Sequence, residues 1–422
     1  MKLLVVGGGG REHAIIRSLR KNPNVETIFA LPGNAGMEDE ALCVNIGAKD
    51  IPAIVDFAVS HEVDYAVVAP DDPLVLGAVD ALEAKGIPCF GPRANAAILE
   101  GSKVFSKELM KKYHIPTARY EVFQDMDAAL AYLDTAPVPT VIKADGLALG
   151  KGVVIAQNEE EAKAALHSIM EDKIFGESGA HVVVEEFLTG PEVSVLAFTD
   201  GKAMCPMVSS MDHKRAYDGD KGPNTGGMGT ISPNPFYTQE VAQQCMERIF
   251  LPTMAAMNAE GRPFKGCLYF GLMLTPDGPK VIEYNSRFGD PETQVVLPRL
   301  QTDFAQIVEA VAQERLSELS IQWSEQASAC VVMASGGYPG SYPKGIEIHG
   351  LDANGQAEGV TVYHAGTKLE DGKFLTNGGR VLGVTALGDT LEAALNKAYA
   401  AVENITFEGA MYRKDLGRTH QK

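Results

Sequence analysis

The stretch VIKADGLALGKGV, residues 141–153, places a glycine-rich loop directly after an apolar strand. Lys143 ends that strand, and the loop from Gly146 to Gly152 carries a second cation, Lys151. Glycines let a loop bring its N–H groups close to an anion, and lysines offset phosphate charge. The pattern favours a loop that closes over the phosphates of a nucleotide.

This glycine loop is not a Walker A motif. Three residues separate Gly146 from Gly150 where that motif has four, and Gly152 stands where a Ser or Thr would bind Mg²⁺. A mobile hairpin with solvated lysines is the plain alternative. We regard it as the weaker one, because a lysine that follows Val141 and Ile142 in an apolar strand needs a partner.

Upstream of the loop, residues 1 to about 100 alternate strands with helices. The helical stretches include 11–20 and 51–60, and the apolar strands lie at 3–6, 27–30, 65–69 and 88–90. A βαβ pattern of this kind predicts an open parallel sheet.

A glycine run, Gly7 to Gly10, separates the first strand from the first helix. Its N–H groups and the helix dipole suit a phosphate-sized anion. The dinucleotide fingerprint fails, because it needs glycine where Glu12 or His13 stands, and the next strand ends in Leu31 and Pro32 without an acidic residue. A nicotinamide cofactor is therefore not favoured, and a tight turn with glycines for packing alone explains the run nearly as well.

Downstream of the glycine loop, the pattern predicts further units. Residues from about 114 to 190 read as a small α+β lobe, and 209–233 read as a long irregular loop, which in a globular chain is usually functional or disordered. Two strands, 268–274 and 280–284, are joined by the turn TPDGP. A third region opens with a strand at 327–334.

The stretch VIEYNSRFGDPETQ, residues 281–294, ends an apolar strand in polar side chains. Side chains two apart on a strand share a face, so Glu283 and Asn285 point the same way. Paired oxygen donors that leave room for phosphate oxygens and water suit Mg²⁺, and Arg287 could offset anionic charge. A buried ion-pair cluster would cost desolvation free energy without an evident gain, so we favour a metal site.

Two other polar stretches are weaker signals. In VVVEEFLTGPEVS, residues 182–194, the main chain could meet an adenine edge and a carboxylate could meet ribose hydroxyls, although exposed acids at sheet edges are common. MDHKRAYDGDKGPNTGGMGT, residues 211–230, packs cations, anions and glycines into one loop. His213 within it is suited to acid–base chemistry, and an ordinary polar histidine is an equal alternative.

The bulk composition limits the classes of function. The 422 residues are 45% hydrophobic and 22% charged, and the net charge is −18, which argues against non-specific binding to nucleic acid or anionic membranes. The six cysteines are scattered without a CxxC pair, and the start MKLLVVGGGGREH lacks the features of a signal peptide. We therefore expect a cytoplasmic protein with reduced thiols and no zinc.

Together these motifs resemble those of ATP-grasp ligases and, more narrowly, of the glycinamide ribonucleotide synthetase (phosphoribosylamine–glycine ligase) family of purine biosynthesis. The specific motifs are RFGDPE and GPNTGGMG, because many ATP-grasp enzymes share the glycine loop. The similarity runs nearly end to end, through GGGGREHA, PGNAG, LEGSK, IKADGLALGKGV, EEFLTGPEVS, DHKRAYDGDKGPNTGGMG, RFGDPETQ, HAGTK and NGGRVL.

The resemblance implies a fold of the α/β class with α+β lobes. We expect an ATP-grasp fold with an N-terminal parallel α/β domain at 1–102, an ATP-grasp domain at 103–315 that includes a lid lobe at about 114–190, and a C-terminal α/β domain at 325–422.

The resemblance also implies an ADP-forming carbon–nitrogen ligase that joins glycine to 5-phosphoribosylamine through glycyl phosphate. ATP is the expected co-substrate and Mg²⁺ or Mn²⁺ the expected metal. One alternative is another ATP-grasp ligase with a different carboxylate and amine, which the GPNTGGMG loop argues against. A second is a nicotinamide-dependent oxidoreductase, which the failed fingerprint disfavours. Beyond the small molecules we expect no nucleic acid and no membrane, and a monomer or weak dimer.

Carried over motif by motif, the resemblance assigns roles to individual residues. The expected metal ligands are Glu283 and Asn285, and the expected catalytic residues are Arg287, Asp290 and Asp212. The ATP-binding set, in which Glu192 meets the ribose, is Lys103, Lys143, Gly146, Gly150, Lys151, Gly152, Glu185, Glu186, Phe187, Leu188 and Glu192. The set for glycine and phosphoribosylamine is Gly8, Gly9, Gly10, Arg11, Glu12, Asn34, Lys214, Asn224, Thr225, Gly226 and Gly227.

Four positions depart from the family pattern. Asp71 and Leu76, in APDDPLVLG, replace Glu and Lys, which puts some contacts to the amine substrate in doubt. If they disable that side, the chain would bind nucleotide without turnover. Leu149 replaces a small residue of the glycine loop and Ser286 replaces Cys, and neither touches the expected metal ligands.

Overall fold

The first sheet of the computed structural model is parallel at every pairing. The structure describes residues 1–148 and 152–418. The sheet has the order β3-β2-β1-β4-β5 and consists of β1 (Lys2–Gly7), β2 (Thr27–Pro32), β3 (Leu42–Cys43), β4 (Tyr65–Val68) and β5 (Cys89–Phe90). Its helices are α1 (Gly10–Leu19), α2 (Ile51–Ser60), α3 (Asp71–Val75) and α4 (Ala78–Ala84). The predicted open parallel sheet is confirmed.

Strand β1 shows why this sheet is covered on both faces. Leu3 and Val5 pack into the core that also contains Ile15, whereas Leu4 and Val6 pack into the core on the other face. These four side chains are fully buried, as expected for the central strand of a parallel sheet.

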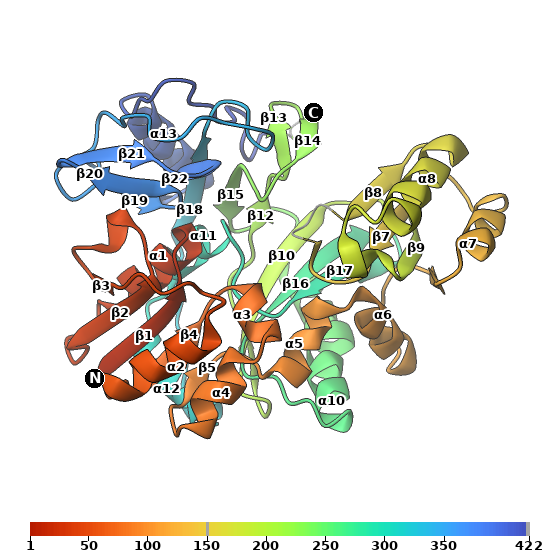
Figure 1. Cartoon of the computed structure of the whole chain (residues 1–422), viewed down its shortest axis with the longest axis horizontal. Coiled ribbons are helices and arrows are strands. Elements are labelled where there is room, and N and C mark those ends of the chain that lie inside the picture. The colour runs from red at the N-terminus through yellow and green to blue at the C-terminus, as the bar shows by residue number, and fades with distance from the viewer. Residues whose placement is uncertain (149–151, 419–422) are drawn as a thin grey trace.

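A second sheet forms the lobe at the right of Figure 1, with the order β6-β9-β7-β8 and antiparallel pairings. Helices α5 (Ala94–Gly101) and α6 (Lys103–Lys112) lead into it. Its elements are β6 (Tyr120–Phe123), α7 (Met126–Leu133), β7 (Thr140–Ala144), β8 (Val153–Ala156), α8 (Glu159–Leu166) and β9 (Val182–Glu186). The apolar faces of α7 and α8 share one core with β7 and β9.

The third sheet is central and antiparallel, with the order β11-β10-β16-β17. It consists of β10 (Glu192–Thr199), β11 (Met204–Pro206), β16 (Gly266–Thr275) and β17 (Gly278–Asn285), with α9 (Gln239–Cys245) and α10 (Leu251–Ala259) nearby. The predicted hairpin around TPDGP is confirmed as β16 and β17. A register shift leaves Ile282 unpaired as a bulge, because Gly271 faces Glu283 while Leu272 faces Val281.

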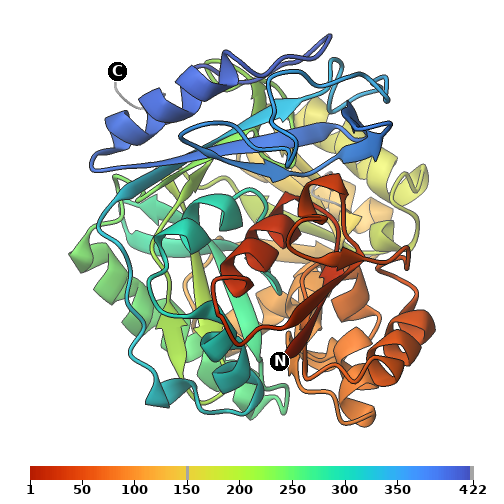
Figure 2. The same ribbon diagram turned by 90° about the vertical axis from the view of Figure 1, so that its left-hand side faces the viewer.

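The fourth sheet has the order β12-β15-β18-β22-β19 and lies across the top of Figure 2. Three of its strands come from the end of the chain: β18 (Ala327–Ala334), β19 (Thr361–His364) and β22 (Arg380–Gly388). Beside it lie the small sheet of β20 (Thr367–Glu370) and β21 (Lys373–Thr376) and the helices α11 (Thr293–Val296) and α13 (Leu391–Val402). Helix α12 (Phe304–Ala312) instead packs against β4 and β5 of the first sheet.

The prediction of an irregular loop at 209–233 is wrong. The segment contains four short strands: β12 (Met211–Asp212), β13 (Arg215–Tyr217), β14 (Lys221–Asn224) and β15 (Gly229–Ser232). β13 and β14 pair as an exposed hairpin, whereas β15 is buried and pairs with β18. Local periodicity does not show this, because the partner strand lies far along the chain and polar residues fill the hairpin.

Among the residues that the structure describes, no helix is long and apolar enough to cross a membrane.

Candidate active site

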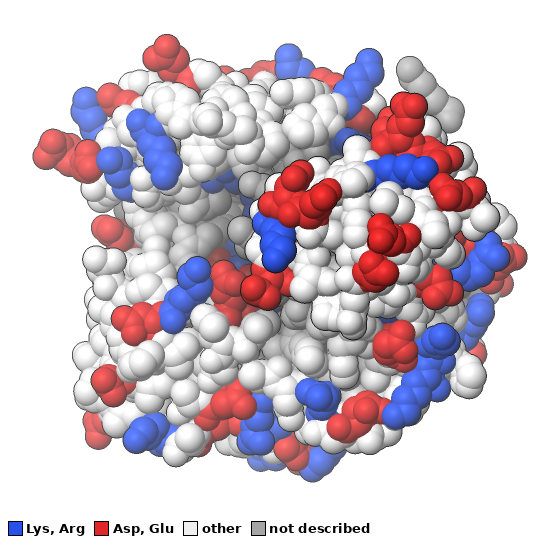
Figure 3. Space-filling model, turned by 45° about the vertical axis from the view of Figure 1, so that its right-hand side comes forward, with Lys and Arg blue, Asp and Glu red and all other residues white. Residues whose placement is uncertain are grey.

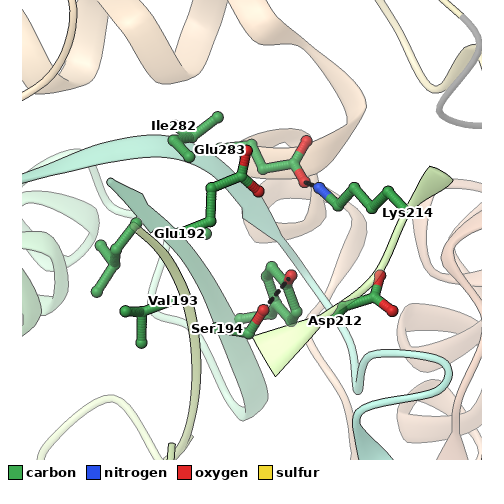
Figure 4. Close-up of a pocket in the computed structure, with 10 residues that line it drawn as sticks. Glu192, Val193, Ser194, Asp212, Lys214, Ile282 and Glu283 are labelled. Carbon is green, nitrogen blue, oxygen red and sulfur yellow. Dashed lines mark hydrogen bonds and ion pairs between the residues drawn. The ribbon is translucent and has the colours of Figure 1, made fainter. Parts of the chain in front are cut away.

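A pocket opens where the central sheet meets the segment that follows β12 (Figure 4). It collects predicted residues from three separate stretches of sequence, since Glu192, Lys214 and Glu283 all line it. In the space-filling view the surface is hollowed near the centre, and acidic and basic side chains meet at the rim (Figure 3). The complete lining is Glu192, Val193, Ser194, Asp212, Lys214, Tyr269, Gly271, Leu272, Ile282 and Glu283.

The Glu283 carboxylate is surrounded by cations. Its Oε1 lies 3.5 Å from Nζ of Lys214, the contact drawn dashed in Figure 4. Burial alone would raise the pKa of Glu283, yet nearby cations outweigh burial and lower it: they are Lys214, Lys143, Lys103 and Arg287. Glu283 in turn raises the pKa of Lys214 well above its usual value. Glu283 is therefore held as an anion, as a cation ligand must be.

Asn285 lies two residues further along β17, on the same face as Glu283. Its hydrogen-bond surroundings orient the amide nitrogen toward Oε1 of Glu100 (3.0 Å) and the carbonyl of Tyr284 (3.2 Å), which leaves the amide oxygen on the opposite side. A carboxylate and an amide oxygen fit the preference of Mg²⁺ for hard donors. Within 1–148 and 152–418 no cluster of three Asp, Glu, His or Cys side chains suited to a metal is present, so phosphate or water oxygens would have to complete the coordination.

Two lysines, one of them a predicted nucleotide residue, gather around the buried carboxylate of Glu185, on β9. One of its oxygens, Oε1, lies 3.1 Å from Nζ of Lys143 and 3.2 Å from Nζ of Lys107. Lys143 also donates to the carbonyl of Ile282, at 3.2 Å. Burial lowers the pKa of Lys107 to about 8. Lys143 thus has the partner that its apolar strand required.

Other predicted nucleotide residues lie around this pair of lysines. Lys103 donates to the carbonyl of Gly146 at 2.6 Å and so touches the start of the glycine loop, and Gly152 is buried just before β8. Glu186 pairs with Arg119 at 2.9 Å. Phe187 is exposed and Leu188 half-buried. Gly150 and Lys151 lie outside the described residues, as does the departure at Leu149.

Asp212, half-buried in the pocket lining, interacts electrostatically with the buried carboxyl of Glu292. Burial and then the charge of Glu292 raise the pKa of Asp212 well above its usual value. Burial also raises the pKa of Glu292, whose Oε1 accepts a hydrogen bond from the hydroxyl of Tyr269 at 3.1 Å. Two carboxyls in such surroundings hold a proton more readily than exposed ones.

The two most specific motifs meet at Gly227. Its φ of +125° lies in the region that favours glycine, and a Cβ there would lie 2.7 Å from Oδ1 of Asp212 and 2.5 Å from Cδ of Pro291. GPNTGGMG and RFGDPE are therefore in direct contact, and a side chain at 227 would force them apart.

Arg380, which the sequence reasoning missed, joins the same two motifs from β22. Its Nη1 donates to the carbonyls of Gly226 and Asp290, both at 2.9 Å, and Nη2 lies 3.6 Å from Oδ2 of Asp290. Glu100 was also missed: its buried carboxylate pairs with Arg287 at 3.0 Å. The sequence did contain a signal for these residues, because each is a charged residue within a motif that resembles the family: Arg380 lies in NGGRVL, Glu100 in LEGSK and Glu292 in RFGDPETQ.

The N-terminal glycine run lies against RFGDPETQ, but one of its N–H groups is already used. Gly9 donates to Oε2 of Glu12 at 2.8 Å, and the other oxygen of Glu12 pairs with Arg11 at 2.9 Å. Arg11 also donates to the carbonyl of Phe288, at 3.2 Å. One N–H group fewer than expected therefore remains for an external anion.

Asn34 and Asn224 hold structural positions. The amide nitrogen of Asn34 donates to the carbonyls of Gly8 (2.9 Å) and His364 (2.7 Å) and so joins the first sheet to the fourth. Asn224 is exposed and pairs with Arg215 in the β13–β14 hairpin. Their roles toward substrate stay predictions.

Comparison with known protein families covers nearly the whole chain. Models of the phosphoribosylglycinamide synthetase N domain, ATP-grasp (A) domain and C domain match residues 1–100, 101–293 and 328–419. The chain belongs to the phosphoribosylglycinamide synthetase family. The resemblance read from the motifs is confirmed, and the oxidoreductase alternative is set aside.

Individual members of the phosphoribosylglycinamide synthetase family match over their full length. The phosphoribosylamine–glycine ligase of Caldanaerobacter subterraneus subsp. tengcongensis is 49% identical over 416 residues, which cover 99% of both chains. That of Escherichia coli K12 is 50% identical over 421 residues, covering 99% of this chain and 98% of the relative. The crystal structure of the Thermotoga maritima phosphoribosylamine–glycine ligase superposes with a TM-score of 0.87 at 34% identity, covering 98% of this chain and all of that one. The predicted ATP-grasp fold is confirmed.

Proposed function

We propose that the chain is a phosphoribosylamine–glycine ligase, the activity for which its relatives are named. It would use ATP to join glycine to 5-phosphoribosylamine, giving glycinamide ribonucleotide, ADP and phosphate in purine biosynthesis. The observation that supports this proposal most directly is that four predicted site residues line the same pocket: Glu192, Asp212, Lys214 and Glu283.

In the first step the carboxylate of glycine attacks the γ-phosphate of ATP, which gives glycyl phosphate and ADP. Lys103 and Lys143 would neutralise phosphate charge as it develops. Lys143 is paired with Glu185, 3.1 Å away, so a bound phosphate would draw it from one anion to another. Glu192, exposed at the start of β10, would meet the ribose, and the main chain from Glu185 to Leu188 would meet the adenine.

A divalent cation, Mg²⁺ or Mn²⁺, fits the donor set of Glu283 and Asn285. When bound it would supply charge neutralisation on the phosphates. The protein's own part is to keep Glu283 ionised, for which the surrounding cations lower its pKa.

In the second step the amine of 5-phosphoribosylamine attacks the acyl carbon and phosphate leaves. The attacking amine must lose a proton, and Asp212, whose pKa is raised by burial and by Glu292, is suited to accept it. Arg287 and Asp290 would border the acyl phosphate. The phosphoribosylamine would lie toward the side where Gly9 and Arg11 contact RFGDPETQ.

The domain boundaries, the monomer or weak dimer and the cytoplasmic location stay predictions. The fourth sheet bears on the boundaries, because it takes β12 and β15 from the middle of the chain and β18, β19 and β22 from its end. A truncation at about residue 315 would therefore leave two strands without their sheet.

The test is ADP release that requires both glycine and phosphoribosylamine. We expect release above background when both are present together with Mg²⁺, and formation of the ligated product in equal amount. Release with another small amino acid in place of glycine would instead favour the related-ligase alternative. If neither substrate stimulates ADP release, the proposed function is wrong.

A further inference from the structure

The last described residues of the chain hold the segment that carries Lys214. We call residues 413–417 the C-terminal anchor and residues 213–227 the substrate loop. The loop contains the β13–β14 hairpin, and its first and last residues approach the pocket. The anchor contacts it through main chain and side chains.

Arg413 is the central residue of the C-terminal anchor. Its side chain is fully buried. Nη1 donates to Oδ1 of Asp220 at 2.8 Å and to the carbonyl of Arg215 at 3.3 Å, while Nε and Nη2 form a fork on Asp415, both at 2.8 Å. A buried guanidinium with two carboxylates and a carbonyl has one low-energy position, so it fixes the loop backbone that it bonds.

Three further contacts hold the substrate loop on the C-terminal anchor. Asp415 accepts the N–H of Gly219 at 2.8 Å, and Asp218 accepts the N–H of Lys414 at 2.8 Å. Burial alone would raise the pKa of Asp415, but the hydrogen bonds from Arg413 and Gly219 outweigh it and bring the pKa to about 2. The N–H of Gly417 donates to Nε2 of His213 at 3.1 Å, which gives this histidine a packing role rather than an acid–base one.

These contacts place Lys214 between two fixed neighbours. Its own carbonyl accepts from the N–H (2.7 Å) and the hydroxyl (2.8 Å) of Thr225, on the returning side of the loop. The next carbonyl, that of Arg215, accepts from Arg413. The preceding residue, His213, is tied to Gly417. The backbone of Lys214 is thus held on both sides while its ammonium reaches Glu283.

We propose that Arg413 is a positioning residue of the active site, which acts through the substrate loop to hold Lys214 and Asp212 against the pocket. The expected effect of Arg413 on catalysis rests on the proposed function. The C-terminal anchor would then contribute to turnover although none of its residues lines the pocket. Several of the expected nucleotide residues lie away from the substrate loop, on α6, β7 and β9. Of the same expected set, Glu192 lines the pocket with Lys214, so nucleotide binding should depend only weakly on Arg413.

The test compares Arg413→Ala, Arg413→Lys and Asp415→Asn with the full-length protein. We expect Arg413→Ala to lower kcat for ligation at least about tenfold, with the Kd for ADP within about twofold of the original. Arg413→Lys should recover part of kcat, since it keeps the charge but loses the fork. Lys414→Ala is the matched control, because Lys414 is exposed on the same segment.

A second measurement does not depend on turnover. Amide hydrogen exchange should rise in residues 211–227 of Arg413→Ala and Asp415→Asn, and stay unchanged in β7 and β9. Unchanged kcat, unchanged exchange in 211–227, or exchange that rises equally throughout the chain would each overturn the proposal. If the unsubstituted protein shows no ligation, the proposed function fails, and the exchange pattern alone then decides whether Arg413 holds the loop.

Discussion

The ammonium of Lys214 lies 3.5 Å from a carboxylate oxygen of Glu283, the residue expected to bind the metal. A divalent cation bound at Glu283 would therefore share one anion with the ammonium of Lys214. Because like charges repel at this distance, metal and lysine must be balanced by the phosphates of a nucleotide. Metal binding should be weak without nucleotide and stronger with it.

This relationship predicts the behaviour of Glu283→Gln. The amide keeps the shape but loses the charge, so we expect metal-stimulated turnover to fall about 100-fold or more, with the thermal unfolding midpoint nearly unchanged. Turnover measured against Mg²⁺ concentration checks this. Glu370→Gln, on the exposed strand β20, is the control. A Glu283→Gln protein with the original metal dependence would remove Glu283 from the metal site.

The shared carboxylate of Glu185 predicts an effect on nucleotide affinity. Lys107→Met removes one of the two ammonium groups on Oε1, so Glu185 should hold Lys143 more strongly and release it less readily to a phosphate. We expect the KM for ATP to rise about tenfold, with a smaller change in kcat. Steady-state kinetics measure both, and Lys111→Met, exposed on the same helix, is the control. An unchanged KM would mean that Lys143 does not exchange Glu185 for the nucleotide.

The contact at Gly227 predicts a steric defect. A methyl group there would meet Asp212 and Pro291 at less than 3 Å, so Gly227→Ala should separate the two motifs and lower kcat at least about tenfold. Gly261→Ala is the control, because Gly261 also has a positive φ but no atom within 4 Å of its Cβ position. Equal effects of the two substitutions would assign the defect to backbone strain alone.

Two buried histidines, His213 next to β12 and His364 on β19, predict acid sensitivity. Burial lowers the pKa of His213 and of His364 to about 4, from 6.5. The unfolded chain binds these protons near pH 6.5, whereas the folded chain resists them until about pH 4, so stability is full above 6.5 and is lost as the pH falls toward 4. Each histidine contributes up to about 3 kcal/mol to this loss.

The dependence of stability on pH can be measured from thermal unfolding midpoints between pH 7 and pH 4. His364 donates to the carbonyl of Gly355 at 2.7 Å and contacts the hydroxyl of Thr367 at 2.9 Å. His364→Gln can keep such hydrogen bonds without titrating, so its unfolding midpoint should fall less steeply with acid. The same slope in both proteins would show that carboxylates alone set the acid dependence.

The elements with strong local patterns could be predicted from the sequence. Residues 51–60 and 327–334 are a helix and a strand with the expected bounds, because the helix has apolar periodicity after an Asp50 cap and the strand is a largely apolar run. The pairing of strands into sheets was harder to predict from the sequence. β9 and β10 are separated by a short turn yet belong to different sheets, since partners far along the chain decide which ladder each strand joins.

The site divides in the same way. Glu283 and Asn285 could be paired from their spacing, because a strand repeats every two residues. Lys214 opposite Glu283, Asp212 beside Glu292 and Arg380 between two motifs could not, since each depends on contacts between distant segments. The charged residues in the matching stretches could be recognised as functional candidates from the sequence. Their contact partners could be identified only from the fold.

The mixed origin of the fourth sheet has a consequence for biosynthesis. β15 leaves the ribosome long before its partner β18, and Arg413 emerges later still. Until then the segment that carries Lys214 has neither its neighbouring strand nor its anchor, and its backbone groups are free to pair elsewhere. The nascent enzyme can fold its N-terminal sheet and the lobe of β6 to β9 before these later segments are made. It becomes a catalyst only once β18 and Arg413 have joined the segment that carries Lys214, which separates nucleotide capture from ligation in the order of assembly.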